Sequence, residues 1–535
     1  MKKRLIVLIA LILSPLLIYL MYPLDDRRYA ITADRAMLER KRAFLDARRT
    51  CAHARNRPNI VIILADDLGK TDISLYGGTA VHTPNIDALG KEGVVFDEAY
   101  CTSPICSPSR AGMLTGRYGQ RYGYETQPNS RYPRNRLEYY AYKNFVNTGN
   151  WVLAPLQGIP AEEDIARQGL PASEITLAEL LGADGYRTAI TGKWHLGHNG
   201  DFIPNNRGFG YQYGFYEAFT LYAPIGSPGI VEHRHDYFAS KHIWAQERTG
   251  TCAIRRDGAV IDEKEYLTFA IAREAVQFIK ENSAAPFLLY VPFSAPHTPF
   301  QAPVSYCERF SHVADTNKRV YYAMIAALDD AVGMISRAIK DAGLDEKTLV
   351  VFASDNGGAT YTGATDNAPL KGGKFTNFEG GINVPLALRW KGRISGGARY
   401  TKPVSLLDVF ATAASAAGCA LPSDREIDGV DLLPYVTGSA KCSPHRALFW
   451  RSCFNRAVRK GDWKLIVDER SGRKLLYNMR ADKVEHRDLS AGNPETIEEL
   501  MNHFRAWEKG MTGPLWPRVM DYRFVIDGEE FYYAL

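Results

Sequence analysis

The stretch "NIVIILADD", from Asn59 to Asp67, decides the fold. Five apolar residues, Ile60 to Leu64, precede the two adjacent aspartates Asp66 and Asp67. A short apolar run bounded by polar residues is consistent with a fully buried strand. The stretch therefore predicts a central strand that ends in a pair of acidic side chains.

Three other apolar runs are also followed by polar or charged side chains. "TLVVFASDNGG" ends in Asp355 and Asn356, "YRTAITGKWHLG" in Lys193 and His195, and "PFLLYVPFSAPH" in His297. Strand alternation predicts that the side chains of Lys193 and His195 point to the same side. In open α/β sheets, ligands bind beyond the carboxyl ends of the strands. We expect these four ends to bring acids, an amide, a lysine and histidines to one place.

Helical patterns separate these runs, at residues 265–282 and 320–343. "NVPLALRW" and "SLLDVFATAASAAG" predict a further strand and helix that close a large domain near Gly418. Short runs separated by turns then predict a small antiparallel sheet, followed by a helix from Thr496 to about Met511. The predicted class is α/β: a large mixed, mostly parallel sheet flanked by helices, with a smaller C-terminal α+β domain. The predicted organisation is an N-terminal segment (1–24), a linker (25–57), a large domain (58–430) and a C-terminal subdomain (431–535).

The composition is that of a globular protein, with 46% hydrophobic and 23% charged residues among 535. A net charge of +5 is mild for this length, so we expect no nucleic-acid partner. The stretch from Tyr118 to Trp151 is rich in Tyr and Arg, has little periodicity and exceeds the usual length of a connection. It is either a functional loop or a solvated surface insertion.

The N-terminus predicts an extracytoplasmic location, in the periplasm or on the outer side of a membrane. Lys2, Lys3 and Arg4 precede an apolar run from Leu5 to Leu24, long enough as a helix to cover roughly 30 Å of bilayer. No A-x-A cleavage site follows it, which favours an uncleaved anchor over a cleaved signal peptide. Eight scattered cysteines allow one or two disulfides in such a compartment, and none has zinc-ligand spacing.

The candidate metal ligands are hard oxygen donors. Asp66, Asp67, Asp355 and Asn356 together suit Ca²⁺ or Mg²⁺ rather than zinc. Lys193 and His195 can hold an oxyanion and transfer a proton, and Lys374 lies in the glycine-rich stretch "KGGKFTNFEGGINVP". Taken alone, Lys374 would be a flexible surface lysine.

The motif "CSPSRAGMLTG", which begins at Cys106, resembles the C-x-P-x-R signature of type I sulfatases. "GKWHLG", "APHTP", "SDNGG" and "KFTNFEGG" continue the resemblance in the family's order, as do "PNIVIILADDLG", "TPNIDALGKEG" and "LYNMRADKVEHRDLS". The resemblance covers the chain from Pro58 to about Ala491. It implies the alkaline-phosphatase-like sulfatase fold and a sulfuric ester hydrolase that acts on sulfated polysaccharides or their oligosaccharides.

The resemblance also implies cofactors and partners. Cys106 would be oxidised to Cα-formylglycine (3-oxoalanine) by a formylglycine-generating enzyme, which recognises Pro108 and Arg110. The hydrated aldehyde would be the nucleophile and a ligand of the metal, for which the family favours Ca²⁺ over Mg²⁺.

Residue roles follow from the same resemblance. Lys193, Lys374 and the metal would hold the sulfate, and Arg110 would steady the diol. His297 would protonate the leaving alcohol and His195 would act as the base, although the two roles could be exchanged. A further polar residue of the family pattern has four candidates here: Tyr213, His233, His235 and Asp236.

Two other functions remain open. One is a phosphate or phosphonate monoester hydrolase, because the same fold can serve phosphoryl chemistry. The other is a non-catalytic protein that binds at a membrane surface and in which Cys106 stays a thiol.

Overall fold

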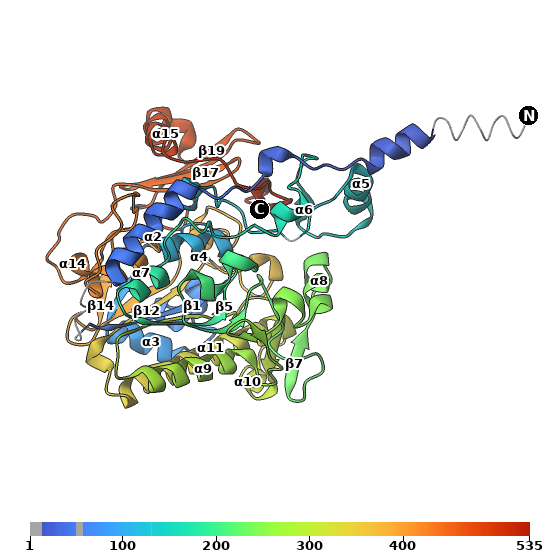
Figure 1. Ribbon diagram of the computed structural model, residues 1–535. Helices are drawn as coiled ribbons and strands as arrows, with labels where there is room; N and C mark the ends of the chain where they lie inside the picture. Colours follow the sequence, from blue (N-terminus) through green and yellow to red (C-terminus); the bar gives the residue numbers. More distant parts are fainter. Residues whose placement is uncertain (1–12, 50–56, 130) are drawn as a thin grey trace, which may run out of the picture.

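A computed structural model describes residues 13–49, 57–129 and 131–535 (Figure 1). Its centre is a ten-stranded sheet in which the Asn59 strand, β1, occupies the fifth position. The strands, in spatial order, are β14 (Ala398–Tyr400), β2 (Val94–Phe96), β13 (Leu386–Arg389), β12 (Thr348–Ser354), β1 (Asn59–Ala65), β10 (Phe287–Pro292), β5 (Arg187–Lys193), β6 (Tyr211–Phe215), β8 (Arg255–Arg256) and β9 (Ala259–Val260). The pairs from β12 to β6 are parallel, whereas β13 and β8 run antiparallel to their inner neighbours. The expected mixed, mostly parallel sheet is confirmed.

Helices cover both faces of this sheet (Figure 1). One layer contains α3 (Pro84–Lys91), α9 (Leu267–Asn282) and α11 (Thr316–Asp341), and the other contains α2 (Arg35–Arg49), α4 (Cys106–Thr115) and α7 (Leu177–Ala183). A further helix, α13 (Asp408–Ala416), packs against α4 and α7. Every residue of β1 is buried, and its side chains alternate between two core clusters, with Ile60, Ile62 and Leu64 in one and Val61 and Ile63 in the other. This two-sided burial explains why the run is continuously apolar rather than alternating.

The C-terminal region contains the expected antiparallel sheet. Its strands are β16 (Leu448–Ser452), β17 (Asn455–Lys460), β18 (Trp463–Asp468) and β19 (Arg473–Asn478), and α15 (Pro494–Glu508) packs against them through a small core. Lys464 on β18 forms ion pairs with Glu379 and Glu485, and these three side chains are at most 2% exposed. The subdomain is therefore joined to the large domain through buried charges as well as apolar contacts.

A second, three-stranded sheet was not expected. The hairpin β20 (Met520–Ile526) and β21 (Glu529–Ala534) pairs with β4 (Trp151–Leu153), which lies at the end of the Tyr- and Arg-rich stretch. The stretch also contains α5 (Arg136–Phe145), whose Asn135 side chain accepts a hydrogen bond from the Glu138 amide as an N-cap. The end of the chain thus anchors the insertion, and the domain boundary at residue 430 stays a prediction.

Shorter elements complete the described chain. The remaining strands are β3 (Ala99–Tyr100), β7 (Ile230–His233), β11 (Phe300–Pro303) and β15 (Val404–Ser405), and the remaining helices longer than one turn of 3₁₀ helix are α6 (Glu162–Ile165), α8 (Phe238–Gln246), α10 (Val304–Glu308), α12 (Glu379–Ile382) and α14 (Leu433–Val436).

Two expectations concern the N-terminus and the cysteines. In the described residues no helix has the length and hydropathy needed to cross a membrane, and part of the run Leu5–Leu24 lies outside those residues. Seven cysteines lie in the described ranges and all are free thiols, so the one or two disulfides that the sequence allows do not form among them. Cys51 lies outside these ranges.

Candidate active site

Four adjacent strands carry the predicted side chains to one edge of the large sheet. The strands are β12, β1, β10 and β5, and they are parallel to one another. Because parallel strands end on the same side, the residues that follow β12, β1 and β10 meet Lys193, the last residue of β5. The structure brings together the seven residues predicted at these ends and places Cys106, at the start of α4, against them.

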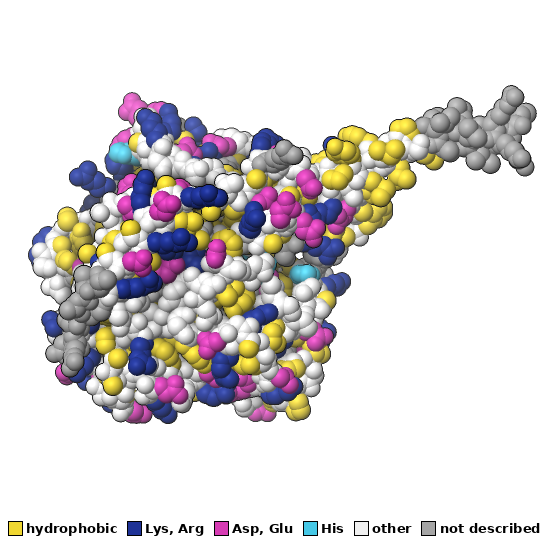
Figure 2. All heavy atoms as spheres, in the orientation of Figure 1, with side chains coloured by type: hydrophobic (Ala, Val, Ile, Leu, Met, Phe, Trp, Pro, Cys, Tyr) yellow, Lys and Arg dark blue, Asp and Glu magenta, His cyan; other side chains and the backbone are white. Residues whose placement is uncertain are grey.

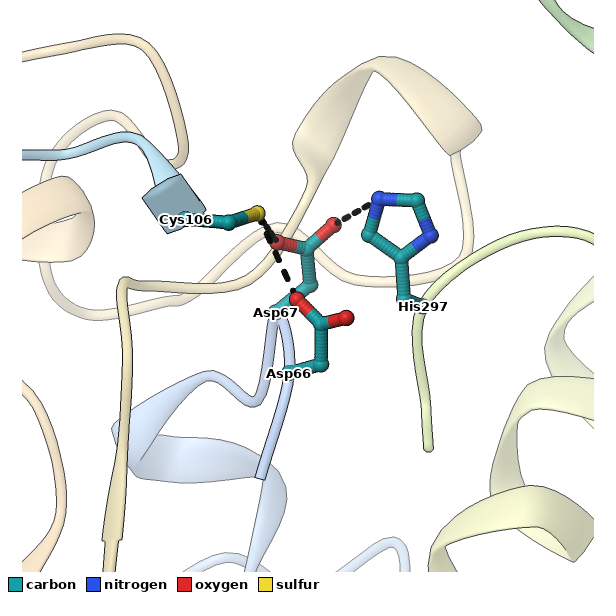
Figure 3. A group of neighbouring side chains, drawn as sticks. All are labelled: Asp66, Asp67, Cys106 and His297. Atoms are coloured by element: carbon teal, nitrogen blue, oxygen red, sulfur yellow. Dashed lines mark hydrogen bonds and ion pairs between the residues drawn. The ribbon is translucent and has the colours of Figure 1, made fainter. Parts of the chain in front are cut away.

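The side chain of Cys106 points toward the carboxylates of the two aspartates that follow β1 (Figure 3). Its Sγ is 3.3 Å from Asp66 Oδ1 and 3.6 Å from Asp67 Oδ1, and the residue is only 2% exposed. Burial raises the pKa of the Cys106 thiol well above its ordinary value, despite the opposing effect of Lys193 and Lys374. As encoded, the side chain is therefore a neutral thiol and a poor nucleophile.

Two buried lysines neutralise the aspartates. Lys193 Nζ donates to Asp66 Oδ2 over 2.6 Å, and Lys374 Nζ lies 2.8 Å from Asp67 Oδ1 and 2.9 Å from Oδ2. Burial alone would lower the pKa of Lys374, but Asp67 and Cys106 raise it well above its ordinary value. Lys374 is therefore a fixed buried cation rather than a flexible surface lysine.

Arg110 is directed at the acids rather than at the thiol. Its Nε donates to Asp355 Oδ2 over 2.8 Å, its Nη1 donates to the Lys193 carbonyl over 3.1 Å, and its Nη2 lies 3.5 Å from Asp66 Oδ1. These contacts hold the ends of three strands, β12, β5 and β1, together through one fully buried side chain. The predicted contact of Arg110 with the diol stays a prediction.

Carboxylate and amide oxygens converge here in a way that could hold a cation. Burial and the neighbouring Asp66 raise the pKa of Asp355 to about 7, and Asn356 Oδ1 is buried without a hydrogen-bond partner. Asn356 Nδ2 donates to Asp67 Oδ1 over 2.8 Å, which places the amide beside the aspartates. Ligand atoms of Asp66, Asp67, Cys106 and His297 all lie within 4.8 Å of one another, so this group could hold a metal ion.

The two histidines differ in their surroundings. His297 Nδ1 is 2.6 Å from the Thr298 carbonyl, to which it can donate, and Nε2 faces Asp67 Oδ2 at 3.6 Å (Figure 3). Both ring nitrogens of His195 are buried without a hydrogen-bond partner. Burial lowers the pKa of His297 to about 4 and that of His195 well below its ordinary value, and nearby lysines contribute to both shifts. Both rings are therefore neutral in the site as described.

His195 reaches the site by a different route from the one expected. β5 ends at Lys193, and His195 has a φ of +57°, so strand alternation does not determine where its ring points. Asp67 (φ +60°) and Phe375 (φ +68°) share this left-handed conformation, which is uncommon for residues other than glycine and often marks functional sites. The Ser107 hydroxyl donates to the His195 carbonyl over 2.6 Å and fixes this turn against α4.

A cavity of about 280 Å³ opens onto this group and is lined by His195, His297 and Lys374. The Tyr- and Arg-rich stretch contributes several lining residues, among them Arg131, Tyr142 and Trp151, and is therefore part of the site. Trp151 packs edge-on against Tyr361 with ring centroids 4.8 Å apart, and Tyr361 stacks on Phe375 at 5.6 Å. Val519 and Met520 complete the wall from the C-terminal region.

The candidates for the further polar residue do not line this cavity. The Tyr213 phenol donates to Glu263, His235 Nε2 lies 3.1 Å from Asn317 Oδ1, and Asp236 pairs with Lys241 at the surface. The His233 ring packs edge-on against His235. The sequence indicated the stretch that contributes Trp151 as a candidate functional loop, but it did not indicate Tyr361 and Phe375, which lie in a segment without periodicity.

Comparison with known proteins identifies the family. Residues 58–419 match the family model described as Sulfatase. The chain is 34% identical over 422 residues to N-acetylgalactosamine-6-sulfatase of Canis lupus familiaris, covering 77% of this chain and 72% of that protein. It is 32% identical over 470 residues to steryl-sulfatase of Homo sapiens, with coverages of 76% and 74%.

Solved structures agree with the sequence matches. The crystal structure of Ps i-CgsB has a TM-score of 0.72 and 30% identity, and the match covers 86% of this chain and 94% of that one. The same protein has been solved in complex with k-i-k-neocarrahexaose, and that structure matches with a TM-score of 0.71. A phosphonate monoester hydrolase of Agrobacterium radiobacter shares the fold, with a TM-score of 0.56 and 19% identity. Because the family model matches residues 58–419 and both relatives are more than 30% identical over more than two thirds of their own length, the chain belongs to the sulfatase family and is a sulfuric ester hydrolase.

Proposed function

We propose that this sulfatase acts on sulfated oligosaccharides outside the cytoplasm, with a formylglycine derived from Cys106 and a bound Ca²⁺. The observation that carries the proposal is the position of Cys106 among two aspartates and two lysines, one of which, Lys374, lines a cavity of about 280 Å³. Once hydrated, the formylglycine would supply a hydroxyl that attacks the sulfur of the sulfate ester. The buried neutral thiol of Cys106 does not supply such a nucleophile.

The donor set fits Ca²⁺. Three buried carboxylates and the unpartnered Asn356 Oδ1 offer hard oxygen ligands. Ca²⁺ and Mg²⁺ prefer such ligands, whereas zinc is usually bound by nitrogen and sulfur. The family resemblance favours Ca²⁺ over Mg²⁺. We assign Asp66, Asp67, Asp355, Asn356 and the modified Cys106 as the residues that would hold the ion. When bound, the ion would offset negative charge on the sulfate and acidify the attacking hydroxyl.

The lysines would bind the sulfate oxygens. Lys193 and Lys374 are held by Asp66 and Asp67, so both ammonium groups are already in place before substrate arrives. Preorganised cations of this kind stabilise charge that develops on the transferred group without reorganisation during the reaction. Arg110 would act through Asp355 and Asp66, which it orients.

The histidines would transfer protons. His297 lines the cavity, so it is placed to protonate the leaving alcohol. Its ring is neutral in the site as described, and the negative charge of a bound sulfate ester would favour the protonated form. His195 is neutral and has two free ring nitrogens, which suits a base.

The cavity supports a carbohydrate ring as the alcohol. Its volume of about 280 Å³ is near the lower end of small-molecule sites, roughly 300–1,000 Å³, and suits one ring better than an extended chain. Aromatic faces such as those of Trp151 and Tyr361 pack well against the apolar faces of sugars. Structural similarity to a protein solved with a neocarrahexaose supports the same class.

Two measurements test the proposal. Mass spectrometry of the Cys106 peptide, from protein made in its native host or beside a formylglycine-generating enzyme, should show a loss of about 18 Da relative to the thiol. The same preparation should release sulfate from a panel of sulfated oligosaccharides and leave phenyl phosphate and phenyl phosphonate unchanged. An unmodified thiol in an active preparation would refute the nucleophile, and activity confined to non-carbohydrate sulfate esters would refute the substrate class.

A further inference from the structure

Large exposed apolar side chains are concentrated in two segments of the described chain. The first segment contributes Leu13, Leu16, Leu17, Ile18, Tyr19, Met21 and Tyr22, each at least half exposed, and α5 contributes Leu137, Tyr140 and Phe145. Figure 2 shows apolar side chains gathered where the N-terminal segment leaves the body of the protein. We call these ten residues the apolar patch. The other large exposed apolar side chains, such as Val260 and Leu421, are scattered.

The two segments of the apolar patch are in contact. The Leu24 amide donates to the Arg134 carbonyl over 3.1 Å, and Pro23 forms a β-bridge with Asn135. One turn into the N-terminal segment, the Arg136 guanidinium lies 4.4 Å from the centroid of the Tyr19 ring. The start of α5 is therefore attached to the end of the N-terminal apolar run.

The helix α5 has two different faces. On the inner face, Tyr139 is buried and its hydroxyl donates to the Ala154 carbonyl over 3.2 Å, while Glu138 and Tyr142 line the catalytic cavity. On the outer face, Leu137 and Tyr140 are each 45% exposed. Phe145, the last residue of the helix, projects beyond the packed part of the inner face and is 87% exposed. A helix with one packed face and one exposed apolar face normally has a partner for the second face.

The chemistry of the surroundings indicates a lipid bilayer as that partner. The sequence continues the apolar patch toward the N-terminus, since residues 5–12 are all apolar. Arg134, Arg136 and Lys143 flank the exposed side chains and could reach lipid phosphates. Tyrosine and basic residues around an apolar surface are typical of segments that lie at a membrane interface.

We propose that α5 rests on the surface of a lipid bilayer, beside the N-terminal apolar segment. An α-helix with its side chains is only about 10–12 Å across, and α5 touches the cavity with its inner face. The catalytic cavity therefore lies within about one helix diameter of the membrane surface. Sulfate esters that are tethered to the same bilayer would reach the site, and this placement does not depend on which alcohol carries the sulfate.

The test uses the full chain in nanodiscs that contain phosphatidylcholine and phosphatidylglycerol, with one chain per disc. Cys51 and Cys442 are first replaced by serine, and a fluorescent label is attached to F145C. The matched control is V260C, because Val260 is 63% exposed and lies on β9 at the edge of the large sheet. Lipids with a nitroxide near the headgroup should quench the label at residue 145 at least about fivefold more strongly than the label at residue 260.

Equal quenching at both positions would overturn the proposal, provided that both labelled variants keep full activity on a soluble aryl sulfate. A second copy as the partner is also distinguishable. If the partner were a second copy of the chain, the emission of the label at residue 145 would depend on protein concentration in detergent. In single-chain discs the same label would then stay unquenched, which would likewise overturn the proposal. As a second readout, the double variant Y140E/F145E should lose activity on a lipid-tethered sulfate ester but keep it on the soluble one.

Discussion

Replacing Lys374 by methionine should separate the two tasks of this buried cation. In the free enzyme the ammonium group offsets the charge of Asp67, to which it is bonded at 2.8 and 2.9 Å. Removing one partner of a buried ion pair costs about 3–5 kcal/mol of stability, because the other charge stays buried without its partner. Removing a preorganised donor to the sulfate costs about 10²–10³-fold in kcat, or roughly 3–4 kcal/mol.

A metal titration distinguishes these costs. Thermal unfolding of the methionine variant should show its largest loss of stability in chelator, and Ca²⁺ should recover part of it because the ion also neutralises Asp67. The loss of kcat should persist at saturating Ca²⁺, because the ion does not replace the contact with the sulfate. Both quantities are measured on preparations with the same fraction of formylglycine.

The matched control is Lys371→Met on the same loop. Lys371 Nζ is 2.7 Å from Asp527, whose side chain is 70% exposed, so this pair is worth only about 0–1 kcal/mol. The control should keep its activity and its stability to within that amount. A Lys374→Met enzyme that retains kcat/KM within about tenfold of the parent would refute the assigned role in sulfate binding.

Three further predictions follow from the site and its surroundings. Asp355→Asn removes one of the carboxylates that converge with Asp66 and should weaken Ca²⁺ binding at least about tenfold in isothermal titration; unchanged affinity would exclude Asp355 as a ligand. Trp151→Ala should raise KM for a sulfated oligosaccharide about 10–100-fold and leave a small aryl sulfate nearly unaffected, whereas equal effects on both would argue against a sugar-stacking role. His445 Nε2 lies 2.8 Å from Asp408 Oδ1. Burial alone would lower the pKa of the His445 ring, but Asp408 raises it above the ordinary 6.5. The contribution of His445 to stability is therefore complete below about pH 6.5 and is lost as the pH rises through the raised pKa. Chemical unfolding of His445→Gln against pH should therefore differ most from the parent in acid, and a constant difference across pH would contradict this linkage.

The catalytic edge could be predicted from the sequence because burial and chemistry coincide there. β1 and its neighbours are covered on both faces, so each is a continuous apolar run, and the polar residues that follow it stand out. Parallel topology then brings the ends together without further information. His195 is an instructive exception: it lies at the cavity, but a left-handed residue after the strand, not strand alternation, determines its position.

The cavity wall could not be predicted in the same way. Trp151 is held by pairing of β4 with β20, a strand more than three hundred residues later in the chain, and Tyr361 and Phe375 come from a loop without periodicity. Nothing local in these segments indicates such partners. The catalytic residues follow directly from the strand ends in the sequence, whereas the shape of the cavity wall depends on contacts between distant segments.

The burial of Cys106 also sets an order of events during biosynthesis. In the folded protein this residue is 2% exposed, is the first residue of α4 and lies against Asp66 and Asp67. A converting enzyme needs the surrounding peptide in its own active site, so it would have to act on the emerging chain before α4 docks. The yield of active enzyme in a foreign host would then depend on the rate of Cys106 oxidation relative to the rate of folding. Slower synthesis or a lower temperature would raise the modified fraction without any change in sequence.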